Sequence, residues 1–215
     1  MAPRQAAKAN IATHAARCAL KRFQSERMAM THADLLASPE SRTAAQFFLS
    51  DLYGAEDMTQ RDADIERIIP VMEKLLPVQA LATISDAMVL DALSESLDAV
   101  MASRLGELFS EDDYIAAYRE LTQRVDREKQ LAYVQSVGNS LCELVRVPLI
   151  GSTLKMMRGP AKLAKLSELH DFLERGFAAF KGMKQPRIFV ATIIAREAAM
   201  MDNLYAERIR PFALE

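Results

Sequence analysis

Hydrophobic residues recur with the period of an α-helix along almost the whole chain, and no segment shows the alternation of a half-buried β-strand. The clearest stripe consists of Ile65, Ile68, Ile69, Met72, Leu75 and Leu76. Apolar side chains at this spacing share one helix face, which is buried against other helices. Only seven of the 215 residues are glycine, so long stretches are free of helix breakers. We therefore predict an all-α fold, an irregular bundle of six to eight helices.

Prolines, glycines and capping residues divide the chain into predicted helices. These cover residues 6–36, 40–53, 59–76, 77–105, 111–147, 160–182 and 187–208. The first is a candidate for a helix that protrudes from the rest. Without long linkers or repeats, residues 1–215 are predicted to form a single domain.

The predicted helix over 111–147 is too long for a domain of this size, because 37 residues would extend about 55 Å. We expect either a kink near Gly138 and Asn139 or a projecting helix that pairs with another subunit. Ser110 and Asp113 have the spacing of an approximate capping box at the start of this helix.

Charge is distributed unevenly along the sequence. The net charge is +5 over residues 1–30, −12 over 31–114 and +5 over 115–215, although the whole chain carries only −2. An acidic middle between basic ends favours neighbouring helices of complementary charge. The alternative is a surface with two faces of opposite sign.

The cellular location of the protein is predicted from features that the sequence lacks. Cys18 and Cys142 are too few for a disulfide framework, and the first residues do not resemble an apolar signal sequence. The longest uncharged apolar run, residues 188–195, is eight residues long, whereas a membrane span requires about twenty. We expect a cytoplasmic protein without a transmembrane segment.

No catalytic, phosphate-binding or metal-binding motif is present in the sequence. None of the histidines, which are His14, His32 and His170, has a glutamate three residues before it as in di-iron bundles. His170 and Glu174 lie one helical turn apart and are interpreted as a surface pair. We predict no catalytic residue, no metal and no cofactor.

The most aromatic stretch of the chain lies at residues 47–54. On a helix, Phe47 and Phe48 occupy different faces, so both faces should be buried, and Asp51 would then require a polar partner. One interpretation is a structural corner. The other is a ligand pocket lined by Phe47, Phe48 and Tyr53.

The same stretch reads Phe-Phe-Leu-x-Asp-Leu-Tyr-Gly. It is followed by Arg-Asp-Ala-Asp-Ile-Glu-Arg at 61–67 and Leu-Asp-Ala-Leu-Ser-Glu at 90–95. These segments resemble an uncharacterised family of bacterial helical proteins, most closely over residues 20–110. The resemblance implies a bacterial, and specifically proteobacterial, origin. It implies no activity, cofactor or catalytic residue.

Residues 188–195 are apolar on every helix face and are followed directly by Arg196 and Glu197. Such a run belongs at the centre of a bundle or in a dimer interface, and we expect a homodimer. A charged pair beside a buried run requires partners. Structural pairing is one interpretation, and anion binding by Arg196 is the other.

A basic stripe recurs at helical spacing at Lys155, Arg158, Lys162 and Lys165. It is interpreted as solvated or internally paired, as a surface for an acidic protein partner, or as a contact for lipid or nucleic acid. Because the chain is not basic overall, we expect neither nucleic acid nor peripheral membrane contact.

Three functional hypotheses remain. The leading one is a non-enzymatic binding or regulatory module that acts through protein–protein contacts. The alternative is a helical carrier or sensor that encloses an apolar small molecule, which a cavity of several hundred Å³ would favour. The third is an enzyme with an unrecognised site around Asp51, Arg196 and Glu197, which a buried polar cluster opening into a cleft would favour.

Overall fold

The computed structural model describes residues 2–48, 78–163 and 167–213. Within these ranges the chain forms nine helices and no strand, which confirms the predicted all-α fold. The count exceeds the prediction because two of the predicted helices are each divided in two and because residues 150–163 form a helix of their own. The helix predicted over 59–76 lies outside the described residues.

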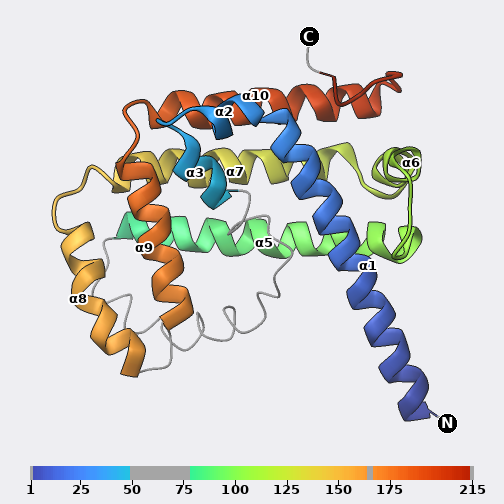
Figure 1. Ribbon diagram of the computed structural model, residues 1–215, viewed down its shortest axis with the longest axis horizontal. Helices are drawn as coiled ribbons and strands as arrows, with labels where there is room; N and C mark the ends of the chain where they lie inside the picture. Colours follow the sequence, from blue (N-terminus) through green and yellow to red (C-terminus); the bar gives the residue numbers. More distant parts are fainter. Residues whose placement is uncertain (1, 49–77, 164–166, 214–215) are drawn as a thin grey trace.

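Three long helices form a central layer, namely α5 (Val78–Leu105), α7 (Arg124–Leu144) and α10 (Pro186–Tyr205). Figure 1 shows them side by side and antiparallel, with α7 in the middle in contact with both neighbours. Helix α1 (Ala2–Thr31) crosses this layer obliquely and packs against α5, and its N-terminal end extends beyond the layer.

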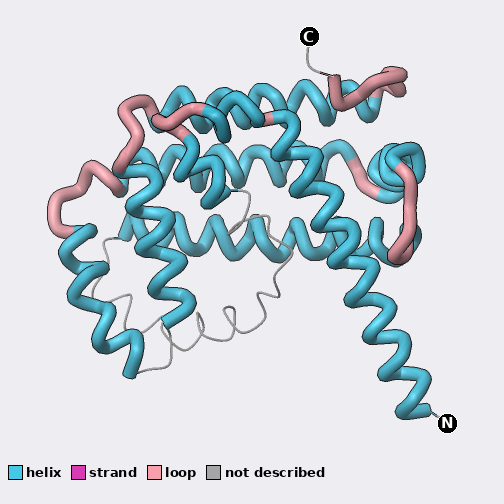
Figure 2. The backbone as a smooth tube through the Cα atoms, viewed as in Figure 1, coloured by secondary structure: helices cyan, strands magenta, loops and turns pink. Residues whose placement is uncertain are grey.

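Shorter helices cover the two ends of the layer. At one end, α6 (Glu111–Leu121) contacts α5 and α10. At the other, α9 (Ser167–Lys181) contacts α7, α3 (Arg42–Phe47) and α8 (Ile150–Leu163), and the short α2 (Ala33–Ala37) joins α1 to α3. Figure 2 shows that the loops of the described chain lie mainly at these two ends.

The first predicted helix is not continuous. It ends at Thr31 and resumes at Ala33, because His32 leaves the helical conformation with φ −112° and ψ 26°. The His32 side chain is buried and reaches Glu197 of α10. A tertiary contact therefore accompanies this break, for which the local pattern carries no signal.

The prediction of a kink near Gly138 is wrong. The chain instead breaks at Thr122, where the backbone is extended (φ −116°, ψ 144°), so that α6 and α7 are separate helices. Gly138 lies inside α7, where Val190 of α10 packs closely against it. The predicted capping box is confirmed, because Ser110 and Asp113 exchange both expected hydrogen bonds.

A second predicted boundary is also wrong. The helix predicted over 160–182 does not begin at residue 160, because Gly159 and Pro160 lie inside α8, which continues to Leu163. The next helix therefore begins at Ser167 rather than at residue 160.

Among the described residues, the buried side chains form two large clusters and a smaller one around Leu144 and Ile150. The first lies where α3, α7, α9 and α10 meet and includes Phe47, Cys142, Phe180, Phe189 and Ile193. The second lies between α1, α5, α6 and the end of α10 and includes Leu20, Met101, Tyr114, Tyr118 and Leu204. Polar residues of α1, α5 and α7 lie between these clusters and are described below.

None of the helices in the described ranges combines the length and the apolar composition needed to cross a membrane.

Candidate functional site

A cleft of about 290 Å³ runs along α5 and α7 and is also lined by α1, α3, α6, α8, α9 and α10. Its lining on α5 begins at Ala80 and reaches Asp98, a distance of about 27 Å along the helix axis. The wall differs between its two ends. We call the end near Ala80 the apolar end and the end near Asp98 the polar end.

The apolar end is formed by aromatic and aliphatic side chains from five helices. They include Phe47, Leu144, Ile150, Phe177, Phe180 and Phe189. The five helices converge here because each buries one apolar stripe against the others. Such a surface favours apolar ligands and offers no group for covalent chemistry.

Arg127 is the main feature of the polar end. Its side chain is only 4% exposed, and its guanidinium group lies over the ring of Tyr118, 4.3 Å from the ring centroid. It donates hydrogen bonds to Thr122 Oγ1, Gln130 Oε1 and the sulfur of Met101. All of these acceptors are neutral. Among the described residues, no carboxylate forms an ion pair with this buried cation.

Asp98 of α5 also lines the polar end, and the charge of Arg127 acts on its carboxylate. Its carboxylate accepts a hydrogen bond of 2.9 Å from Gln24 of α1. Burial raises the pKa of Asp98, and this effect exceeds the opposing influence of Gln24 and of the charge on Arg127. A carboxyl group with a raised pKa retains its proton more readily, so Asp98 is an incomplete counterion for Arg127.

A second set of buried charges joins three helices, and two of its members, Arg27 and Glu197, also line the cleft. Glu197 of α10 accepts hydrogen bonds of 2.7 Å from Arg27 of α1 and of 3.0 Å from His32. Burial raises the pKa of Glu197, but Arg27 and His32 outweigh it, and the net pKa is lowered. Glu197 and Arg27 thus form an ion pair, which distinguishes Arg27 from Arg127, although Nε of Arg27 and Nδ1 of His32 are buried without a hydrogen-bond partner among the described residues.

Phe47, Phe48 and Glu197, three of the predicted ligand-binding residues, line the cleft. Arg196 is not part of its lining. It makes a bidentate contact with Asp34 of α2, at 2.6 and 2.8 Å, and donates to the carbonyl of Thr31. Asp51 and Tyr53 lie outside the described residues.

The predicted basic stripe lies on the outer face of α8. Lys155, Arg158 and Lys162 are exposed, while Ile150 and Leu154 on the opposite face of α8 are buried. Lys165 lies outside the described residues. Arg158 is paired with Glu174 of α9 at 2.7 Å, whereas no ion pair of Lys155 or Lys162 occurs in the described part of the chain.

Sequence reasoning missed Arg127 and Asp98, although a signal for both exists. Arg127 occupies the same helical stripe as Leu131, Val134 and Gly138, which all line the cleft. Asp98 likewise follows the cleft-lining residues of α5 at helical spacing. A charged residue within an apolar stripe indicates either a buried partner or a ligand.

The cleft can bind a molecule more readily than it can transform one. Asp98, a buried carboxyl group with a raised pKa, is the type of residue that acid–base catalysis uses. However, neither histidine nor cysteine is among the described residues that line the cleft. It therefore lacks the usual partners of a nucleophilic mechanism in the described chain.

Comparison with proteins of curated function and with solved structures found no match. A family model described as a domain of unknown function, DUF8198, matches residues 3–211. This match confirms the resemblance to a family without an assigned activity. Because it covers nearly the whole chain, the protein belongs to the DUF8198 family.

Proposed function

We propose that the protein is a carrier or sensor that binds a small amphipathic acid in the cleft. The apolar tail of this ligand lies along the apolar end, and its acidic head group binds Arg127. The observation that carries the proposal is the buried Arg127 guanidinium at the polar end of the cleft, whose hydrogen-bond acceptors among the described residues are all neutral.

Electrostatics favours an anionic head group. Removing an arginine from water costs several kcal/mol unless a counterion compensates. A guanidinium has five N–H donors, and the described contacts of Arg127 use three of them. A ligand carboxylate would accept from the remaining donors and would supply the missing negative charge.

The size of the cleft favours a small ligand. Its volume of about 290 Å³ lies at the lower end of the range for small-molecule pockets, which begins at roughly 300 Å³. A single short alkyl or aryl chain suits this space. A folded peptide segment or a large cofactor does not.

The cleft also favours the carrier hypothesis over the leading hypothesis from the sequence. A protein-interaction module requires no internal cleft with an uncompensated charge. The exposed basic residues of α8 still support a second candidate function, the binding of an acidic protein partner. Bacterial origin and cytoplasmic location stay predictions.

Homodimerisation also stays a prediction, with less support than before. One of its two grounds was the over-long helix, which is in fact α6 and α7. The other was the run at 188–195, of which Phe189, Val190 and Ile193 are buried within the chain and Ile188 is 59% exposed.

Isothermal titration calorimetry with three ligands of equal chain length tests the proposal. We expect octanoate to bind with a stoichiometry of one and about tenfold to hundredfold more tightly than octanol, because hydrogen bonds to a charged group contribute about 1.5–3 kcal/mol. Octylammonium should bind more weakly than octanol, because its charge has the same sign as Arg127. Equal affinities for all three, or no binding of any, would contradict the proposal. The latter is also the result expected if part of the chain itself fills the cleft.

Two variants locate the binding site. Arg127→Met should remove the preference for octanoate over octanol but retain octanol binding. Arg124→Met is the matched control, because Arg124 lies one turn earlier on α7, is exposed, and pairs with Glu128 and Asp202. Ala87→Trp, which places a bulky side chain in the cleft lining, should weaken both ligands. Unchanged discrimination in Arg127→Met would exclude Arg127 as the head-group contact.

A further inference from the structure

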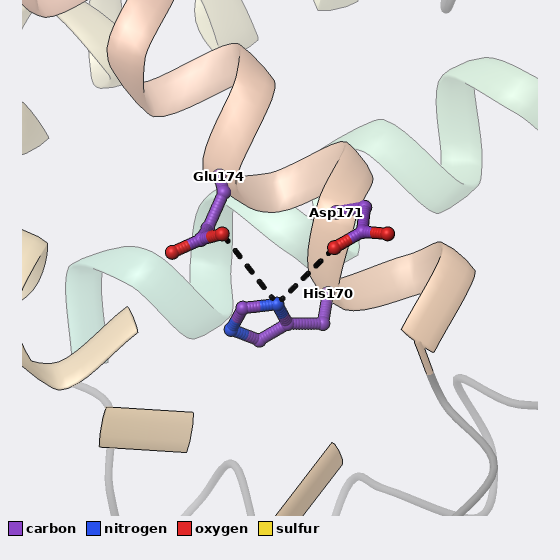
Figure 3. Close-up of side chains that lie close together, drawn as sticks. All are labelled: His170, Asp171 and Glu174. Carbon is purple, nitrogen blue, oxygen red and sulfur yellow. Dashed lines mark ion pairs between the residues drawn. The ribbon is translucent and has the colours of Figure 1, made fainter. Parts of the chain in front are cut away.

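A cluster of three potential metal ligands lies on α9, where α8 packs against it. The imidazole of His170 is directed toward the carboxylates of Asp171 and Glu174 (Figure 3). Nδ1 of His170 lies 3.7 Å from Oδ1 of Asp171 and 3.9 Å from Oε2 of Glu174. The three residues occupy positions i, i+1 and i+4, so all lie within about 100° of the helix circumference. No other cluster of this type occurs among the described residues.

The environment of His170 determines which ring nitrogen is available. Its side chain is only 4% exposed, so the interpretation of His170 and Glu174 as a surface pair is wrong for His170. Nε2 lies 2.7 Å from the backbone carbonyl of Leu154 in α8. A carbonyl only accepts hydrogen bonds, so Nε2 carries the proton and donates it. In the neutral imidazole, Nδ1 then presents its lone pair to the two carboxylates.

A lone pair that faces two carboxylate oxygens is repelled by them, and either a proton on Nδ1 or a metal ion between the three atoms removes this repulsion. A hydrogen bond from a ligating histidine to a backbone carbonyl is the usual means of orienting the ring toward a metal. Zinc accepts one imidazole nitrogen and two carboxylate oxygens, and three protein ligands leave its fourth position open to water.

The distances suit a zinc ion. With bonds of about 2.1 Å, ligand atoms of a tetrahedral zinc site lie about 3.4 Å apart. The separations of 3.7 and 3.9 Å exceed this by only a few tenths of an ångström. Asp171 is 59% exposed, so its side chain can rotate to close the remaining gap. We propose that His170, Asp171 and Glu174 form a binding site for a divalent transition-metal ion, with zinc as the preferred ion.

Arg158 sets the affinity of this site. It lies 2.7 Å from Oε2 of Glu174, the same oxygen that faces His170. Its positive charge competes with the metal for that oxygen and repels a cation nearby. Removing this charge should therefore strengthen zinc binding. If the cluster served only as a set of ion pairs, the same change would instead weaken it.

A metal at this position would act on the wall of the cleft. A cation on Nδ1 polarises the imidazole and strengthens the hydrogen bond from Nε2 to Leu154, whose side chain lines the apolar end. The zinc site does not depend on the proposed ligand, because none of its three residues lines the cleft.

The test is calorimetric titration of the full, metal-free chain with zinc chloride at pH 7.4. We expect one site, and we expect Glu174→Gln and Asp171→Asn each to weaken binding at least tenfold. His170→Asn should abolish it, and Arg158→Gln should strengthen it severalfold.

His14→Gln is the matched control, because His14 and Cys18 form another close pair of potential ligands, at 3.5 Å. Cobalt provides a second measurement that does not rely on variants. A visible spectrum typical of nitrogen and oxygen ligands supports the site at His170, whereas a sulfur-to-metal charge-transfer band would assign the metal to Cys18. Failure of the wild-type chain to bind zinc at millimolar concentration would overturn the proposal. So would unchanged affinity in both Glu174→Gln and Asp171→Asn.

Discussion

Glu197 is the residue on which three parts of the chain converge. It receives hydrogen bonds from Arg27 of α1 and from His32 at the start of α2, while it belongs to α10. The side chains of Glu197 and Arg27 are only 15% and 12% exposed. The sulfur of Met200 accepts a further hydrogen bond from Arg27. The position of α1 on the layer therefore depends on a charged contact with little access to water.

Replacing Glu197 by glutamine should destabilise the protein. Removing one charge of a buried pair leaves Arg27 without a counterion, which costs about 3 kcal/mol. Urea unfolding at pH 7 measures this as a decrease in the free energy of unfolding. Glu128→Gln is the control, because the exposed pair of Glu128 with Arg124 contributes no more than about 0.5 kcal/mol.

The double variant Arg27→Met/Glu197→Gln tests whether the unpaired buried charge causes the loss of stability. It leaves no unpaired buried cation, so it should lose less stability than the sum of the two single variants. Additive losses would show that the two charges are not coupled.

At the scale of elements, the uneven charge distribution is accounted for by neighbouring helices. Arg17 and Lys21 of the basic α1 pair with Glu95 of the acidic α5, and Gln24 bonds Asp98 on the same face. Arg196 pairs with Asp34 in the same way. Of the two interpretations of the charge pattern, the structure shows complementary packing at these contacts. Partly exposed pairs of this type contribute little energy but favour one arrangement of the helices.

The contact of α7 with α10 depends on Gly138. A Cβ atom at this position would lie 2.8 Å from Cγ1 of Val190, a branched and stiff side chain that cannot move away easily. The absence of a side chain at residue 138 thus allows the two helices to pack closely.

Gly138→Ala should lower the free energy of unfolding by about 1 kcal/mol, because overpacking exceeds the gain in helix propensity. In the Val190→Ala background the clash is absent, and the same substitution should raise stability by about 1 kcal/mol. A double-mutant cycle from urea unfolding measures this reversal of sign. Equal effects in both backgrounds would show that Val190 does not restrict residue 138.

At the scale of the whole molecule, carboxyl groups determine the response to acid. Arg196 holds the pKa of Asp34 at about 2, and hydrogen bonds also lower the pKa of Asp113 and Glu143. Glu197 shares this direction. A lowered pKa in the folded state contributes stability above the unfolded value near 4, and this stability is lost as the pH falls through the folded pKa. The contribution of Asp98 to the pH dependence of stability has the opposite sign, because burial raises the pKa of this residue.

Asp98→Asn isolates this opposing contribution. A folded pKa above the unfolded value of about 3.9 means that Asp98 favours folding increasingly as the pH falls toward that value. The variant should therefore lose stability relative to wild type as the pH falls from 7 to 4, by no more than about 1.4 kcal/mol per pH unit. Urea unfolding at several pH values measures this difference. A difference that grows in the variant's favour would mean that the pKa of Asp98 is lowered.

The sequence alone was sufficient for the helical class, for the bounds of α5 and for the capping box at Ser110. These features depend on residues within a few positions of each other, and their signals are periodicity and local hydrogen bonding. Phe47, Phe48 and Glu197 were also identified as candidate site residues, and all three line the cleft.

The breaks at His32 and Thr122, the cleft and its uncompensated arginine depended on the tertiary structure. Each arises from a contact between residues far apart in the chain, such as His32 with Glu197 or Thr122 with Tyr205. The helical stripe predicts that Arg127 is buried, but it does not predict whether a carboxylate lies close enough to pair with it. That outcome depends on which helices meet, because the free energy of a buried charge depends on its neighbours rather than on its position in a stripe.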